Sequence, residues 1–134
     1  MVSGGAPLSV EVKNFLTVAF SVPIFECYGM TESAGCLCST SFWDRKGNNQ
    51  GGILPCNRMQ LRDVPHLNCS TEGSQPTGEI YIKGNSIFKG YYKDPETTKT
   101  VLDEQGWLKV GDIGLLHKNG AIELIERVNE FKKL

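Results

Sequence analysis

The segment that most constrains the fold of this chain is ECYGMTESAG, residues 26–35. It follows the apolar, β-prone residues 22–25, so we predict that a strand ends here and that Gly29 allows a sharp turn and a close approach to another group. A hydroxyl at Thr31 and a carboxylate at Glu32 come directly after that turn. Because a hydroxyl can donate to an anionic oxygen and a carboxylate can hold magnesium, the turn would suit a nucleotide phosphate. The same residues are equally typical of a strand-to-helix turn with Thr31 as the helix cap.

Length and composition are those of one modest globular domain. The chain has 134 residues, of which 40% are hydrophobic and 22% charged, and its net charge is −1. With no cluster of lysine and arginine, we expect no nucleic-acid partner. No apolar run approaches the roughly 20 residues of a membrane-spanning helix, and the N-terminus does not resemble a secretion signal. We therefore expect a cytoplasmic protein, with contact to the cytosolic face of a membrane only through parts outside this chain.

The five cysteines do not have the spacing of a metal site. Their number is odd, none forms a Cys-x-x-Cys pair, and neither histidine has ligand-like spacing to a partner. We predict free thiols in a reducing compartment. The cysteines are Cys27, Cys36, Cys38, Cys56 and Cys69.

Residues 10–20 are predicted to form an α-helix that packs against the core. Ser9 suits the N-cap, and Glu11 in the first turn is favoured by the helix dipole. Apolar residues then recur at helical spacing and give the helix one apolar face. Further along, the polar residues 43–52 are predicted to form an exposed loop.

The remainder of the chain is predicted to be rich in β-strands. Residues 78–84 alternate in polarity between two glycines, which is typical of a strand, and Asn119-Gly120 is typical of a hairpin turn. Asp94 and Pro95 favour the start of a short helix that ends near residue 103. Other strands are predicted at 59–64, 107–110, 113–117 and 121–126, with a turn at Gly111-Asp112.

Six short segments follow one another along the chain: GGAPL (4–8), YGMTE (28–32), GE (78–79), FKGYYKDPE (88–96), GWLKVGD (106–112) and IER (125–127). Together they resemble the acyl-adenylate-forming superfamily, which includes acyl-CoA synthetases, luciferases and the adenylation domains of peptide synthetases. The phrases FKGY, GWL and IER are most similar to long-chain fatty acyl-CoA synthetases. The resemblance covers nearly the whole chain.

The resemblance implies a mixed α/β, β-rich fold that is a fragment of the large N-terminal domain of such an enzyme. Residues 1–50 would be the end of an α/β subdomain, 51–128 a β-barrel-like subdomain, and 129–134 the hinge toward a C-terminal domain. The family's glycine-, serine- and threonine-rich phosphate loop and its acyl-activating lysine are not found in this chain. We therefore expect a middle piece of a longer chain that would not catalyse alone.

The implied reaction has two steps and uses ATP, Mg²⁺ and coenzyme A. A fatty acid carboxylate attacks the α-phosphate of ATP, which gives an acyl-adenylate and pyrophosphate, and the thiol of coenzyme A then displaces AMP. The protein would mainly position the groups and neutralise the charge that develops on phosphate oxygens.

The resemblance also implies the residues that hold the adenine. Gly5 and Ala6 would present bare backbone to the base. Tyr28, next to Gly29 of the same motif, would cover one face of the adenine. Leu124 would close the pocket from the other side.

The phosphates and the ribose are assigned to a second group of residues by the same resemblance. Thr31 would hydrogen-bond the α-phosphate and Glu32 would hold magnesium, so these two are the candidate catalytic residues. Asp112 would accept hydrogen bonds from the ribose hydroxyls, and Arg127 would also reach the ribose. Asn129 falls at the family's hinge between domains.

Two positions depart from the family pattern, and other functions stay open. Val110 stands where the family usually has threonine, and Asn129 where it has aspartate or lysine. Spacing alone favours a surface ion pair of little energetic value between Asp112 and Arg127, and only the other segments in register favour the ribose role. The alternatives are a non-catalytic module that binds a nucleotide or a partner on the same scaffold, and an adenylate-forming enzyme for another carboxylic acid.

Overall fold

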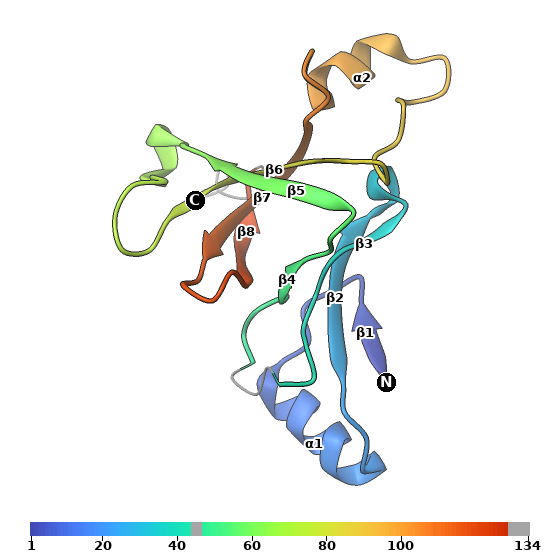
Figure 1. The fold of residues 1–134 in the computed structure, drawn as a ribbon, viewed down its shortest axis with the longest axis vertical. Helices are drawn as coiled ribbons and strands as arrows, with labels where there is room; N and C mark the ends of the chain where they lie inside the picture. The colour runs from blue at the N-terminus through green and yellow to red at the C-terminus, as the bar shows by residue number, and fades with distance from the viewer. Residues whose placement is uncertain (44–46, 129–134) are drawn as a thin grey trace.

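The computed structural model describes residues 1–43 and 47–128 and contains two four-stranded sheets (Figure 1). The strand order is β1-β2-β3-β4 in the first sheet and β5-β6-β7-β8 in the second. The first sheet consists of β1 (Val2–Gly4), β2 (Phe25–Met30), β3 (Gly35–Ser39) and β4 (Gly52–Ile53). The second consists of β5 (Asn57–Arg62), β6 (Thr77–Gly84), β7 (Leu108–Leu116) and β8 (Ile122–Arg127). The helices are α1 (Val10–Phe20), α2 (Pro95–Val101) and the short 3-10 helices η1 (Thr31–Ser33) and η2 (Pro65–Leu67).

The mixed, β-rich fold class is confirmed, but the expected barrel is not formed. β1 runs parallel to β2, and the other neighbouring strands are antiparallel. Within the described residues the second sheet is open, because β5 and β8 are its two edges. The edge at β8 is instead met by the segment that leads into β4: the backbones of Gln50 and Gly51 exchange hydrogen bonds of 2.8 and 2.9 Å with Ile122. This contact protects the edge without closing a barrel.

Buried side chains from both sheets form one core. Leu37 and Cys38 of β3 pack with Ile80 and Ile82 of β6 and with Ile122 of β8, and all five are fully buried. The two sheets are therefore held together by apolar burial as well as by the backbone contacts at residues 50–52. This junction is where the candidate site lies.

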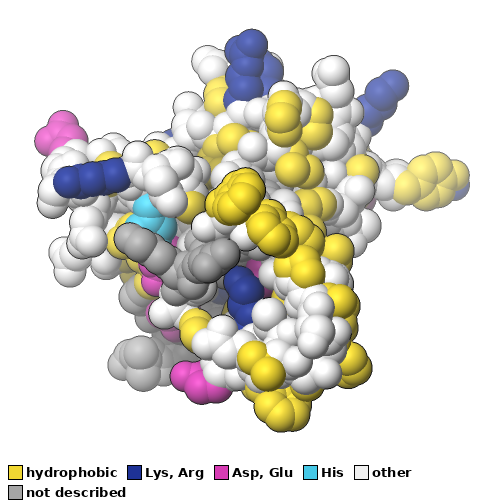
Figure 2. All heavy atoms as spheres, turned by 60° about the horizontal axis from the view of Figure 1, so that its bottom comes forward, with side chains coloured by type: hydrophobic (Ala, Val, Ile, Leu, Met, Phe, Trp, Pro, Cys, Tyr) yellow, Lys and Arg dark blue, Asp and Glu magenta, His cyan; other side chains and the backbone are white. Residues whose placement is uncertain are grey.

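Helix α1 has the predicted bounds, but its predicted packing is wrong. The Ser9 hydroxyl accepts from the backbone N–H of Val12, as an N-cap should. However, no α1 residue is buried by the described chain; Phe15 and Val18 are 69% and 79% exposed. Figure 2 turns this end toward the viewer and shows hydrophobic side chains on the surface. The helix therefore forms where the apolar spacing predicts it, but within the described residues most of its apolar side chains are exposed and the others, such as Leu16, are only partly buried.

The turn predicted at Gly111-Asp112 is a β-bulge inside the continuous strand β7. Lys109 pairs with Tyr81 and Ile113 with Glu79, so three residues of β7 lie opposite Ile80 alone. Gly111 has a φ of 82°, a conformation that glycine adopts without strain. Turns and bulges both use a glycine with positive φ. The glycine alone therefore could not distinguish a bulge from the predicted turn. The predicted strand at 78–84, the Asp94 cap of α2 and the 119–120 hairpin are confirmed.

The turn expected at Gly29 lies two residues later. β2 continues through Gly29 to Met30, and the chain reverses at η1 before returning as β3. The segment is thus a hairpin and not a strand-to-helix turn. The close approach expected of Gly29 is present, because any Cβ there would overlap the carbonyl of Gly35. A residue with a side chain cannot occupy this position without moving β3.

Candidate functional site

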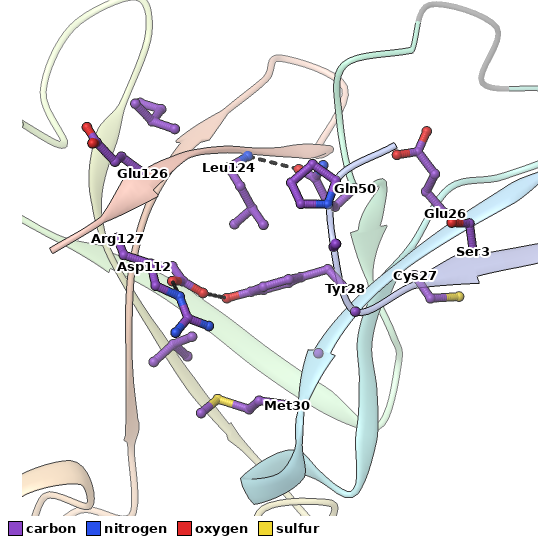
Figure 3. A pocket seen from close by; sticks show the side chains of 16 residues that line it. Ser3, Glu26, Cys27, Tyr28, Met30, Gln50, Asp112, Leu124, Glu126 and Arg127 are labelled. Carbon is purple, nitrogen blue, oxygen red and sulfur yellow. Dashed lines mark hydrogen bonds and ion pairs between the residues drawn. The ribbon is translucent and has the colours of Figure 1, made fainter. Parts of the chain in front are cut away.

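A cavity of about 350 Å³ lies between the two sheets (Figure 3). Its walls come from the loop after β1, from β2, from Gln50 and from the facing parts of β7 and β8. Seven predicted site residues line it: Gly5, Ala6, Tyr28, Gly29, Asp112, Leu124 and Arg127. They are far apart in the sequence, and the junction of the sheets brings them together.

Tyr28, Asp112 and Arg127 form a cluster at this cavity, joined by one hydrogen bond and one ion pair. The Tyr28 hydroxyl donates to Oδ2 of Asp112 at 2.6 Å, and Nε of Arg127 lies 3.2 Å from Oδ1 of the same carboxylate. Asp112 pairs with Arg127 in the β7–β8 ladder, and the Gly111 bulge precedes it. Figure 3 shows the Tyr28 ring reaching from β2 toward Asp112. The cluster therefore ties the first sheet to the second at the cavity wall.

The electrostatics of the cluster keep the tyrosine protonated. Burial, and then the charge of Asp112, raise the pKa of Tyr28 above its usual value near 10. The hydroxyl is thus a donor at neutral pH. Asp112 is only 8% exposed, and its two oxygens can each accept more than one hydrogen bond. A ligand hydroxyl in the cavity could therefore still donate to this carboxylate.

One face of the cavity is bare backbone. Gly5 has a φ of 91°, and a Cβ built there would meet no atom within 4 Å. Gly5 and Ala6 follow the short strand β1, whose pairing with β2 sets their position. A flat ring could approach the backbone of Gly5 here without meeting a side chain of that residue.

Leu124 lines the opposite wall and is held by a residue that the sequence assigned to an exposed loop. The backbone N–H of Leu124 donates to Oε1 of Gln50 at 2.9 Å. The exposed-loop prediction is wrong at the end of 43–52, because Asn49 is only 5% exposed and its side chain caps the Gly51 N–H at 2.8 Å. The sequence of residues 43–52 is polar and contains glycine. Such a pattern does not indicate that the side chains hydrogen-bond to buried backbone groups.

Thr31 and Glu32 lie on η1, outside the cavity lining. Thr31 is exposed, and Glu32 is partly exposed. Buried Ser33 fixes the turn, since its hydroxyl accepts from the Met30 N–H at 3.1 Å and lies 2.9 Å from the Gly35 carbonyl. Hydrogen bonds of Ser33 therefore define the turn that carries the two candidate residues.

Glu32 is contacted by a loop nearly sixty residues away. Tyr91 donates its hydroxyl to Oε1 of Glu32 at 2.6 Å, and the Phe88 N–H donates to the Glu32 backbone carbonyl at 2.8 Å. The hydrogen bond to Glu32 raises the pKa of Tyr91, so this hydroxyl also keeps its proton at neutral pH. No pattern in the sequence pointed to this contact.

Comparison with known proteins assigns the chain to a family. Residues 1–92 match the model of the AMP-binding enzyme family. The chain belongs to this family. It is 42% identical over its whole length to long-chain-fatty-acid–CoA ligase 5 of Mus musculus and 40% identical to the peroxisomal long chain acyl-CoA synthetase 7 of Arabidopsis thaliana, covering 19% of each.

Solved structures of adenylate-forming enzymes have the same fold. The A domain of carboxylic acid reductase from Segniliparus rugosus, in complex with AMP and a co-purified carboxylic acid, matches 96% of this chain with a TM-score of 0.80 and 32% identity. Apo MatB from Rhodopseudomonas palustris matches 95% with a TM-score of 0.79 and 28% identity. This chain corresponds to 19% and 25% of those chains. The chain thus spans about a fifth of the length of the curated relatives it matches.

The described residues of this AMP-binding family member do not form a metal site from protein ligands alone. They contain no group of three or more histidine, cysteine, aspartate or glutamate side chains that could hold a metal ion. The five cysteines are free thiols, and no described helix is long and apolar enough to cross a membrane. Magnesium commonly binds through one or two carboxylates plus substrate phosphates, so a single, partly exposed carboxylate such as Glu32 fits that mode. The predicted hinge, Asn129, lies outside the described residues.

Proposed function

We propose that this chain is part of a longer acyl-CoA ligase that activates a long-chain fatty acid. The enzyme uses ATP to form an acyl-adenylate and then transfers the acyl group to coenzyme A. The relatives named as long-chain fatty acid ligases, which match all of this chain, support the substrate class. The observation that carries the proposal is the cavity in which Tyr28, Asp112 and Arg127 meet.

The cavity is suited to the nucleoside part of ATP. We place the adenine between the Tyr28 ring and the backbone of Gly5 and Ala6, with Leu124 closing the far side. The ribose hydroxyls donate to Asp112, which has acceptor capacity beyond Tyr28 and Arg127. This arrangement uses the bare backbone for a flat base and the buried carboxylate for a diol.

The turn at η1 is suited to the phosphates. Thr31 donates to the α-phosphate, and Glu32 supplies one carboxylate oxygen to magnesium. Bound magnesium would neutralise charge on the phosphate oxygens as the fatty acid carboxylate attacks. Glu32 and Thr31 are adjacent on a turn that the hydrogen bonds of Ser33 fix. Their backbone positions relative to each other are therefore defined.

The rest of the enzyme would complete the site from outside this chain. We propose that residues 1–50 end one subdomain, that 51–128 form the next, and that Asn129 begins a hinge toward a further domain that brings coenzyme A. We also propose that the enzyme works in the cytoplasm or at the cytosolic face of a membrane.

A different acid substrate is the second candidate. The carboxylic acid reductase domain, at 32% identity, holds AMP and a co-purified carboxylic acid on the same fold. The nucleotide site described above would serve any such acid equally well. The identity of the acid substrate is therefore a question for the following experiment.

The test is ATP–pyrophosphate exchange by the full-length protein that contains this chain, with palmitate, acetate, an aromatic acid and amino acids in parallel. Exchange that depends on palmitate supports the long-chain ligase. Exchange with another acid retains the adenylate chemistry and removes the fatty acid. A folded protein that binds ATP and shows no exchange with any acid would instead be a non-catalytic binding module.

A further inference from the structure

The loop 88–93 holds the backbone and the side chain of Glu32 at once. Its contacts are the Tyr91 hydroxyl to Oε1 at 2.6 Å and the Phe88 N–H to the Glu32 carbonyl at 2.8 Å. A short O–H···O⁻ hydrogen bond of this kind is charge-assisted and stronger than a neutral one. The loop therefore constrains both the position of Glu32 and the rotation of its carboxylate.

Tyr91 is itself fixed by the start of α2. Its backbone N–H donates to Oγ1 of Thr98 at 2.9 Å, and that hydroxyl donates to the Asp94 carbonyl at 2.7 Å. The Tyr91 ring packs edge-to-face on Phe88 with 5.0 Å between ring centroids. With both its backbone and its ring held, Tyr91 presents its hydroxyl from a defined place.

The consequence concerns which oxygen of Glu32 a cation can reach. Oε1 already accepts from Tyr91, and Oε2 has no hydrogen-bond partner among the described residues. A cation that binds through one oxygen would therefore meet Oε2. A carboxylate without this constraint would sample several rotamers before binding and would lose that freedom on binding.

We propose that Tyr91 is a positioning residue that fixes the Glu32 carboxylate so that Oε2 faces the divalent cation of a nucleotide complex. This inference rests on the proposed metal role of Glu32. Residues that orient metal ligands by hydrogen bonds typically change metal affinity or activity 10–100-fold when they are replaced.

The test compares Tyr91→Phe with Tyr92→Phe in the full-length protein. Tyr91→Phe removes the hydroxyl but keeps the ring on Phe88, so the melting temperature should stay close to that of the parent. Tyr92 is 88% exposed and is the matched control. Binding of Mn²⁺ in the presence of a non-hydrolysable ATP analogue, followed by electron paramagnetic resonance, reports metal affinity without catalysis.

We expect Tyr91→Phe to weaken Mn²⁺ binding about tenfold and to raise the Mg²⁺ concentration for half-maximal pyrophosphate exchange by a similar factor. Tyr92→Phe should match the parent in both measurements. In a Glu32→Gln background, adding Tyr91→Phe should have little further effect, because the two residues act through one carboxylate.

Three results would overturn the inference, and they identify different faults. If Glu32→Gln weakens Mn²⁺ binding but Tyr91→Phe matches the parent, the positioning role is wrong and the proposed function stands. If neither change alters Mn²⁺ binding, Glu32 does not hold the metal and the inference fails with that assignment. If Tyr91→Phe has its full effect in the Glu32→Gln background, Tyr91 acts through another group.

Discussion

The two halves of the candidate site are built in different ways. The cavity half joins Tyr28 of the first sheet to Asp112 and Arg127 of the second, and Asp112 is only 8% exposed. The turn half carries Thr31 and Glu32 on a 3-10 turn at the surface, with Glu32 steadied by Tyr91. The contacts of the cavity half help to hold the two sheets together and so contribute to stability. The turn half is held in place by neighbouring residues but contributes little to stability.

This difference predicts how each half responds to mutation. Removing a buried partner leaves another polar group without a hydrogen bond, which costs stability. Removing a partly exposed group leaves its partner to water. Changes in the cavity half should therefore lower both stability and nucleotide binding, and changes in the turn half should lower activity alone. Four substitutions probe this contrast, ordered by their expected effect on the free energy of unfolding.

Gly29→Ala should have the largest effect, because the new Cβ would overlap the Gly35 carbonyl and β3 would have to move. We expect a loss of about 3 kcal/mol in the free energy of unfolding, the upper end for overpacking. Denaturant unfolding measures it. Gly52→Ala is the control, since its Cβ would lie 3.9 Å from the nearest atom, the Gly120 oxygen. Equal stability of the two variants would contradict the close approach at Gly29.

Asp112→Ala should destabilise the protein by about 2 kcal/mol, because the partly buried Tyr28 hydroxyl loses its acceptor. Glu123 lies on β8 and pairs with His117 at the surface, so Glu123→Ala should change stability by about 0.5 kcal/mol or less. The comparison uses chemical denaturation at neutral pH. Similar losses in both variants would mean that Asp112 is only a surface partner.

Tyr28→Phe should lower stability by about 1 kcal/mol at neutral pH and should change its dependence on alkaline pH. Because burial and the Asp112 charge raise the folded-state pKa of Tyr28, the folded protein keeps a proton that the unfolded chain releases above pH 10. This contribution is complete below pH 10 and is lost as the pH rises further.

Between pH 9 and 11, the free energy of unfolding of the parent should therefore fall with rising pH. In Tyr28→Phe this fall should be shallower, by up to about 1.4 kcal/mol per pH unit. Tyr92→Phe serves as the control and should keep the parental slope. Burial also raises the pKa of Cys38 to about 12, which adds to the slope in all three proteins. Parallel slopes for all three would contradict the buried, protonated state of Tyr28.

Glu32→Gln should have the smallest effect on stability, within about 0.5 kcal/mol, since Glu32 is partly exposed and the amide oxygen still accepts from Tyr91. Adenylate formation in the full-length protein should fall at least about tenfold, because the group proposed to hold magnesium loses its charge. Pyrophosphate exchange measures the rate. Unchanged exchange from folded protein would remove Glu32 from the metal role.

Much of the local structure could be predicted from the sequence. The cap at Ser9 and the apolar spacing defined α1, and the alternation between Gly78 and Gly84 defined β6. These elements depend on neighbours a few residues away, which a sequence displays directly. The resemblance to a family added seven residues that line one cavity, which no local pattern could have gathered.

The failures share a physical cause, which is that they depend on distant contacts. Gly111 has the conformation of a turn, but the pairing of β6 on one side and β8 on the other makes it a bulge. Gln50 lies in a run predicted to be exposed, but its side chain accepts from the Leu124 N–H, which is 74 residues away in the sequence. The contact of Tyr91 with Glu32 spans 59 residues and has no local signature.

The measurement that tests the central claim most directly is the discrimination between ATP and 2′-deoxy-ATP by Asp112→Asn. Asparagine keeps one oxygen for the Tyr28 hydroxyl, so the variant should fold, but it replaces an acceptor in the cavity by an amide donor. We predict that the full-length parent prefers ATP in kcat/KM and that this preference shrinks toward one in the variant. A folded variant that discriminates as well as the parent would show that the ribose does not contact Asp112.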